Sequence, residues 1–319
     1  MSALAARLKA VGEWPWIWAY GAALAVWLAT IVFTGGQGAG QMLTAAFSFA
    51  AFSVIVGIGQ MHVITLGPGN VELSIPASMT VAGAVSMKVM ATQDSMILVG
   101  LIVALACGAA VGVFNYLLIR ALRIPPIIAT LSSSFLVQST AIAYGRGIKI
   151  KPPPALADFT TWQIAGVPVL AVCVILLAGA MAVVLHRTVY GRSVIAIGQN
   201  PRAALLAGVS VGLVRFATYV MCAVFAGLCG FVLSGFSGGA SLNMGAEYLL
   251  ASIAVVVIGG TSVAGGQSNV SGLWGAALFL FLLVTMLNTF GVGAGIRLVL
   301  TGAIIIAVIV LAGGKAAPR

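Results

Sequence analysis

The sequence predicts an all-α polytopic membrane protein with about ten transmembrane helices, one or more of them broken. Of its 319 residues, 61% are hydrophobic and only 6% are charged, whereas a soluble globular protein carries about 25% charged residues. Ten apolar runs each approach the roughly 20 residues that a spanning helix needs. The 40 glycines fit close helix packing and interrupted helices in a membrane. We therefore expect residues 1–319 to form a single transmembrane domain.

The elements follow in order along the chain. Residues 1–13 form a short basic head, and the aromatic residues Trp14, Trp16, Trp18 and Tyr20 come next, as is typical of a membrane interface. The expected crossings are residues 16–33, 41–60, 62–87, 96–119, 127–144, 167–186, 216–233, 248–263, 270–290 and 296–311. The third crossing is interrupted by Gly67, Pro68 and Gly69, which break a helix.

The basic residues predict the orientation. With ten crossings and the N-terminus inside, both termini and ten of the fifteen Lys and Arg residues lie on the cytoplasmic side. These ten are Arg7, Lys9, Arg120, Arg123, Arg187, Arg192, Arg202, Arg215, Lys315 and Arg319. The other five are Lys88, Arg146, Lys149, Lys151 and Arg297, of which three crowd the loop before a triple proline. The positive-inside bias makes residues 187–215 a cytoplasmic loop.

That loop contains a compact helix signal. Asn200 is a good N-cap, because its side-chain oxygen can accept a free backbone N–H. Pro201 suits the first helical position, and Gly208 suits the residue after the last turn. The expected helix, residues 201–207, has about two turns and is too short to span a bilayer. Its small side chains suggest a contact surface for another protein, and an ordinary cytoplasmic loop is the alternative.

Two glycine-containing stretches interrupt apolar runs. In residues 67–76 the broken backbone must be satisfied by protein or by a water-filled cavity, and broken helices of this kind often line transport pathways. Glu72 stands beside the break, and an ionisable residue at membrane depth is a functional candidate. The alternative is that Glu72 caps the following half-helix. For the second stretch, residues 258–267, a structural role is expected.

Other classes of chemistry lack their motifs. No phosphate-binding G-x-x-x-x-G-K-[ST] loop and no Ser/His/Asp or paired-carboxylate motif occurs, and His62 and His186 stand apart. Five acidic residues leave little for ion coupling through carboxylates. Because the basic residues are scattered one or two per loop, topology explains the net charge of +10 and no nucleic-acid partner is expected. The cysteines lie in apolar runs without metal-ligand spacing: Cys107, Cys173, Cys222 and Cys229.

Four stretches together resemble the bacterial ABC importer permeases of the ribose and xylose type, the carbohydrate uptake type 2 family. They are Glu72-Leu73-Ser74; Ile124-Pro125 with Ile128-Ala129-Thr130-Leu131; Tyr190-Gly191-Arg192 with Ala196-Ile197-Gly198, Asn200, Ala203-Ala204, Gly208 and Val211; and Tyr248, Leu250 and Ile253-Ala254 with Gly259-Gly260-Thr261-Ser262 and Gly265-Gly266. The match covers roughly residues 40–312 in consistent order.

The resemblance implies a permease subunit and not an enzyme. It would move a monosaccharide or similar polyol across the bacterial inner membrane by alternating access, receiving it from a periplasmic binding protein. A second permease subunit, identical or paralogous, and two cytoplasmic ATP-binding cassette subunits would complete the importer. ATP and Mg would bind those partners, with no cofactor or metal on this chain.

The resemblance also implies two sets of site residues. The short cytoplasmic helix would couple to the ATPase through Asn200, Pro201, Arg202, Ala203, Ala204 and Gly208. The translocation pathway and its gate would involve Asn70, Glu72, Leu73, Ser74, Thr130, Ser132 and Tyr248.

The chain departs from the family pattern near the presumed pathway. The usual Gly-Gly turn is Gly67-Pro68-Gly69-Asn70, and Pro76, Pro126 and Ser132 replace a usual glycine, alanine and glycine. These changes suggest an unusual substrate. The alternatives are a branched-chain amino-acid or nucleoside ABC permease, an ion-coupled secondary transporter, and, disfavoured without a catalytic cluster, a membrane-embedded enzyme.

Overall fold

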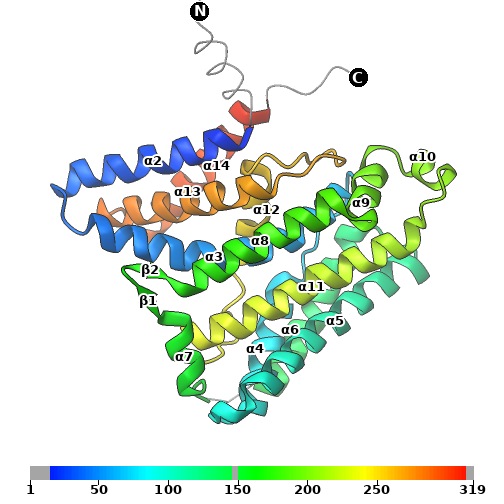
Figure 1. Ribbon diagram of the computed structural model, residues 1–319, viewed down its shortest axis with the longest axis horizontal. Helices are drawn as coiled ribbons and strands as arrows, with labels where there is room; N and C mark the ends of the chain where they lie inside the picture. Colours follow the sequence, from blue (N-terminus) through cyan, green and yellow to red (C-terminus); the bar gives the residue numbers. More distant parts are fainter. Residues whose placement is uncertain (1–14, 146–149, 314–319) are drawn as a thin grey trace, which may run out of the picture.

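The computed structural model describes residues 15–145 and 150–313, which fold into one bundle of helices (Figure 1). The expectations for residues 1–14, Arg146, Lys149, Lys315 and Arg319 lie outside the described residues. In order, the elements are α2 (Pro15–Thr34), α3 (Ala39–Thr65), α4 (Ile75–Met90), η1 (Asp94–Met96), α5 (Ile97–Ala121), α6 (Pro126–Gly145), α7 (Pro154–Thr161), β1 (Gln163–Ile164), β2 (Val167–Pro168), α8 (Val169–Arg187), α9 (Val189–Gln199), α10 (Pro201–Leu206), α11 (Val211–Phe236), α12 (Tyr248–Ile258), α13 (Val270–Thr289) and α14 (Ala294–Gly313).

The all-α prediction is confirmed, apart from a hairpin of two-residue strands, whereas the count of about ten crossings is not. Seven helices in the described part of the chain are long and apolar enough to cross a membrane. Three further apolar helices, Ile75–Met90, Tyr248–Ile258 and Gly295–Ile304, are shorter. Two of these three adjoin the glycine-containing breaks, so a break divides the chain into helical pieces of unequal length.

One expected boundary is wrong. Residues 62–65 were expected to begin the third crossing, but they are the last turn of α3. His62 Nδ1 lies 2.8 Å from the Ile58 carbonyl oxygen, and the Thr65 hydroxyl donates to the Met61 carbonyl at 2.6 Å. Both contacts follow the helical i−4 pattern, so α3 continues without interruption to Thr65. The expected end of the second crossing at Gln60 is therefore wrong, whereas the break itself lies at Gly67, Pro68 and Gly69 as expected.

Helix α11 lies at the centre of the packing and contacts α3, α4 and α5. The G-x-x-x-G pair of α5 makes one of these contacts close: a Cβ on Gly112 would lie 2.9 Å from the Tyr219 carbonyl oxygen, and one on Gly108 would lie 2.9 Å from the Ala223 carbonyl carbon. The pair Gly291 and Gly295 faces open space. Only the first pair therefore serves helix packing.

Helix α2 packs against a helix that is distant from it in the sequence. Helix α2 lies along α13, and the Tyr20 hydroxyl donates to the Ser271 carbonyl at 2.9 Å across 251 residues. Figure 1 shows α2, α13 and α3 side by side in one part of the bundle. The first and the last third of the chain thus form one packed unit.

The two ends of the bundle carry different elements (Figure 1). Helix α7 and the β1–β2 hairpin lie where α8 begins, and α9 and α10 lie where α8 ends. The predicted coupling residues of α10 therefore lie at the end of the bundle opposite the hairpin.

Candidate functional site

The first break, residues 66–74, is a buried segment whose backbone is satisfied by side chains. Beyond the turn at Gly67, the Asn70 side chain donates to the Gly67 carbonyl at 3.0 Å. The Glu72 N–H donates to Gln60 Oε1 of α3 at 3.3 Å, and the Leu73 N–H donates to Thr130 Oγ1 of α6 at 3.2 Å. Two helices, α3 and α6, therefore supply side-chain acceptors for backbone N–H groups of the break.

Glu72 lies at the centre of this segment and is 1% exposed. Its Oε1 accepts hydrogen bonds from the Ser74 N–H at 2.9 Å and from the Ser74 hydroxyl at 2.6 Å. Ser74 is the N-cap residue of α4. Asn115 of α5 donates through Nδ2 to both carboxylate oxygens at 3.0 Å and to Ser74 Oγ at 2.8 Å. The carboxylate therefore ties the start of α4 to α5.

The structure brings together only some of the predicted pathway residues. Asn70, Glu72, Ser74 and Thr130 are buried in this cluster, which we call the Glu72 cluster, and Leu73 is partly buried beside them. Ser132 is exposed on α6, and Tyr248 is partly buried at the start of α12. No hydrogen bond described for residues 15–145 and 150–313 joins either of them to the Glu72 cluster.

Sequence reasoning missed three side chains that bond to the cluster, two amides and a tyrosine. Asn115 and Gln60 are fully buried, and each donates to or accepts from the break. Tyr219 of α11 adds a hydrogen bond of 3.1 Å from its hydroxyl to Asn70 Oδ1. The available signal was a single amide side chain within a long apolar run, since a buried amide needs partners.

The second break, residues 259–269, has hydrogen bonds within itself and to the start of α13. The Asn269 N–H donates to Thr261 Oγ1 at 3.2 Å, and Asn269 Oδ1 accepts from the Gly272 N–H at 3.3 Å, which caps α13. The Ser262 N–H donates to the Gln267 carbonyl at 3.1 Å. Here the expected structural role of the turn fits the geometry.

Helix α10 has the predicted cap. Asn200 Oδ1 accepts hydrogen bonds of 3.0 Å from the N–H groups of Arg202 and Ala203. Gly208 has φ +83° and ends the turn in the left-handed conformation. The helix is Pro201–Leu206 and so stops one residue earlier than expected.

The smooth face expected from Ala203, Ala204 and Ala207 is present only in part. Ala203 and Ala207 are exposed, but Ala204 is 4% exposed and turned into the protein. The exposed surface of α10 also includes Leu205, 62% exposed, and Leu206, 89% exposed, which the sequence did not single out.

Helix α9 fixes α10 to the bundle. The Tyr190 hydroxyl and Thr218 Oγ1 of α11 are hydrogen-bonded at 2.9 Å, and the Tyr190 ring stacks on His62 with 6.2 Å between centroids. Burial raises the pKa of Tyr190 to about 12, so the phenol stays neutral at physiological pH. A neutral, buried anchor is suited to holding α9 in place.

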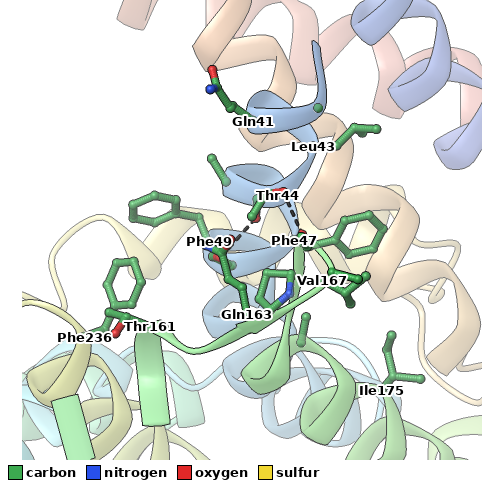
Figure 2. A pocket seen from close by; sticks show the side chains of 17 residues that line it. Gln41, Leu43, Thr44, Phe47, Phe49, Thr161, Gln163, Val167, Ile175 and Phe236 are labelled. Atoms are coloured by element: carbon green, nitrogen blue, oxygen red, sulfur yellow. Dashed lines mark hydrogen bonds between the residues drawn. The ribbon is translucent and has the colours of Figure 1, made fainter. Parts of the chain in front are cut away.

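A cavity of about 1050 Å³ lies at the opposite end of the bundle (Figure 2). It is bounded by α3, α8, the end of α11 and the hairpin, which Thr44 holds by donating to the Gly166 carbonyl at 2.7 Å. Phe47, Phe49 and Ile175 make much of its wall apolar (Figure 2). None of the predicted site residues lines it, so it is separate from the candidate site.

No group of three or more His, Cys, Asp or Glu side chains within the described ranges could hold a metal ion. All four cysteines are free, and Cys222 and Cys229 are buried. The cluster around Glu72 offers one carboxylate with hydroxyl and amide groups, which suits hydrogen bonding rather than metal binding.

Comparisons with known proteins agree over most of the chain. Residues 41–309 match the family described as "Branched-chain amino acid transport system / permease component". The chain is 28% identical over 268 residues to ribose import permease protein RbsC of Escherichia coli (strain K12), covering 82% of this chain and 83% of that protein. It is 30% identical over 270 residues to RbsC of Bacillus subtilis (strain 168), with 84% and 83% covered.

A third relative has another cargo in its name. The chain is 29% identical over 271 residues to autoinducer 2 import system permease protein LsrC of Enterobacter sp. (strain 638), covering 85% of this chain and 79% of that protein. No solved structure matches the chain.

Proposed function

The chain belongs to the family of branched-chain amino-acid transport system permease components, and we propose that it is the transmembrane subunit of an ATP-driven ABC importer for a monosaccharide or similar small polyol. The relatives named for ribose and autoinducer 2 import support this cargo class over a branched-chain amino acid or a nucleoside. A periplasmic binding protein delivers the substrate, and the permease passes it inward by alternating access. ATP and Mg bind two partner ATPase subunits.

The observation that carries this proposal is the exposed leucine pair of α10. A six-residue helix is unstable alone in water, yet this one is capped by Asn200 and anchored through the buried Ala204. The helix presents Leu205 and Leu206 at an end of the bundle where both side chains are mostly exposed. Burial of one leucine side chain contributes about 1.5–3 kcal/mol. We infer that an ATPase groove covers both leucines and that α10 is the coupling helix.

The test is Leu206→Asp, assayed by co-purification of the ATPase subunits in detergent and by sugar uptake in cells. We expect the permease to reach the membrane at normal levels, with ATPase binding and uptake each reduced more than tenfold. Arg202→Ala is the control and should be milder, because an exposed charge contributes little. Full co-purification and full uptake with Leu206→Asp would contradict the assignment of α10 as the coupling helix. That result would favour the alternative function, an ion-coupled secondary transporter.

The coupling role requires α10 to face the cytoplasm. Six arginines lie on or beside the helix ends nearest α10: Arg120, Arg123, Arg187, Arg192, Arg202 and Arg215. From the positive-inside rule we propose that this end of the bundle, and both termini, lie in the cytoplasm. Single cysteines at Gln199 and Asp158, in a background without the native four, test this. If an impermeant reagent on intact cells labels position 199 but not position 158, the orientation is opposite to the one proposed.

The translocation pathway is proposed to run along α6, between two permease subunits. The exposed surface of α6 carries Ser132, Ser139 and Thr140 among larger apolar side chains such as Ile128, Leu131, Phe135 and Leu136. Helix α5 contains no Ser or Thr and exposes Leu98, Ile102 and Leu117. Hydroxyl groups at membrane depth suit a water-filled route better than lipid. The Glu72 cluster then supports α6 from behind, because the Thr130 hydroxyl donates to the Val71 carbonyl at 3.1 Å.

A bulky residue on α6 tests this route. Ser132→Phe should reduce uptake more than tenfold and leave ATPase co-purification intact, because the ring narrows the pathway. Ala110→Phe is the matched control on the exposed face of α5, and it should transport normally. Normal uptake by Ser132→Phe would exclude this face of α6 from the pathway.

A further inference from the structure

Three backbone segments that are distant in sequence meet beside α10. They are residues 65–67 at the end of α3, residues 198–199 at the end of α9, and residues 265–266 in the second break. The Gly266 N–H donates to the Thr65 carbonyl at 2.9 Å, so one hydrogen bond connects the two breaks directly. We call these three segments the glycine junction.

No side chain separates the segments of the glycine junction. A Cβ on Gly198 would overlap the Thr65 carbonyl oxygen and the Gly266 nitrogen, and it would lie 2.9 Å from Gly266 Cα. A Cβ on Gly265 would lie 2.6 Å from the Gly67 nitrogen. A Cβ on Gly266 would lie 2.9 Å from the Gln199 nitrogen. Each of the three segments therefore touches both of the others, backbone to backbone.

Each segment leads within a few residues to a part of the candidate site. Gly198 is two residues before Asn200, which caps α10. Gly67 is five residues before Glu72, and Gly266 is three residues before Asn269, which caps α13. The junction is thus the place where the helix offered to the ATPase meets both broken helices.

We propose that the glycine junction transmits displacement of α10 to both breaks at once, with Gly198 as the positioning residue. This inference rests on the proposed function, since the ATPase is what would displace α10. Gly198 lies directly on the Thr65–Gly266 hydrogen bond, so α9 cannot shift its end without moving that pair. Close-packed contacts have low compressibility and transmit strain, whereas intervening flexible side chains would absorb it.

The first test needs no ATPase. In a background without the native cysteines, Pro68→Cys and Val263→Cys place single thiols at exposed positions in the first and second break. We expect Gly198→Ala to change the labelling rates of both thiols more than threefold. Gly179→Ala on α8, whose added methyl group meets nothing within 4 Å, should change neither. A change at one thiol only, or at neither, would overturn the proposal.

Gln199→Ala provides a second route if Gly198→Ala fails to accumulate. Gln199 is exposed, and its Cγ is 2.6 Å from where a Gly266 Cβ would be, so truncation loosens the junction without a clash. Both thiols should again change their rates together, by about twofold. Unchanged rates at both thiols would contradict transmission through this contact.

The second test separates transmission from stability in the complex with its ATPase subunits. We expect Gly198→Ala to retain ATPase binding and ATP hydrolysis within threefold of wild type, while sugar taken up per ATP hydrolysed falls more than tenfold. If ATP hydrolysis and sugar uptake fall equally, Gly198 serves only for packing, and the proposed transmission is wrong. If the wild-type chain binds no ATPase, the proposed function fails, and the thiol experiment still decides the junction.

Discussion

The α3–α4 break and the α12–α13 break both interrupt helices inside an apolar bundle, but different groups satisfy their backbones. The first break depends on side chains from other helices: Gln60, Asn115 and Thr130. The second depends on close backbone approach, since a Cβ on Gly272 would overlap the Gly259 carbonyl oxygen. Within the second break, Thr261 Oγ1 accepts from the Asn269 N–H, and Asn269 Oδ1 accepts from the Gly272 N–H of α13.

The difference teaches which kind of substitution each break tolerates. A break held by side chains should be sensitive to their removal, because buried polar groups are left unpaired. A break held by backbone contact should be sensitive to added atoms, because close-packed interiors have no room for them. Three predictions examine this comparison through the melting temperature of the purified chain in detergent.

The largest effect is expected when a methyl group is added to α13 where it meets Gly259 of the second break. Gly272→Ala should lower the free energy of unfolding by about 3 kcal/mol, because the atoms it meets are backbone atoms of Gly259. Gly21→Ala on α2 is the control, since its methyl group meets nothing within 4 Å. Equal melting temperatures for the two variants would show that α12 and α13 can separate freely.

The next effect comes from removing a side chain at the first break. Asn115→Ala takes the amide donor from both oxygens of a buried carboxylate, at a cost of about 2–3 kcal/mol. The matched change at the second break, Asn269→Ala, removes one helix cap and should cost about 1 kcal/mol. If Asn269→Ala were the more damaging of the two, the contrast between the breaks would be wrong.

The smallest effect is expected when a methyl group is added to the first break. Gly69 has φ +78° and no atom within 4 Å of an added Cβ. Gly69→Ala therefore adds backbone strain alone, about 1 kcal/mol. A loss as large as that of Gly272→Ala would mean that the first break is also limited by space.

Local chemistry explains what the sequence could predict. The turn at Gly67, Pro68 and Gly69 and the cap at Asn200 depend on residues within a few positions of each other. These features were located because glycine, proline and capping residues act on their own backbone. Glu72 was identified as a candidate because it is an ionisable residue in an apolar region, and its Oε1 accepts a hydrogen bond from the Ser74 N–H at the start of α4.

Tertiary contacts determine the features that the sequence did not predict. Asn115 is 43 residues from Glu72, and nothing in an apolar run states which helix its single amide will face. The inward direction of Ala204 depends on how α9 and α11 hold a helix too short to show periodicity. The two-residue strands β1 and β2 are likewise too short to leave an alternating pattern.

The pairing of α2 with α13 also sets an order of assembly during synthesis. The Tyr20–Ser271 hydrogen bond spans 251 residues, so α2 leaves the ribosome long before its partner exists. At about 5–20 residues per second, roughly 10–50 s separate the two. Throughout that interval lipid must surround the face of α2 that later meets α13. Helix α2, the first helix within the described residues, is therefore among the last to be packed, and a chain that ends before residue 270 leaves it without this neighbour.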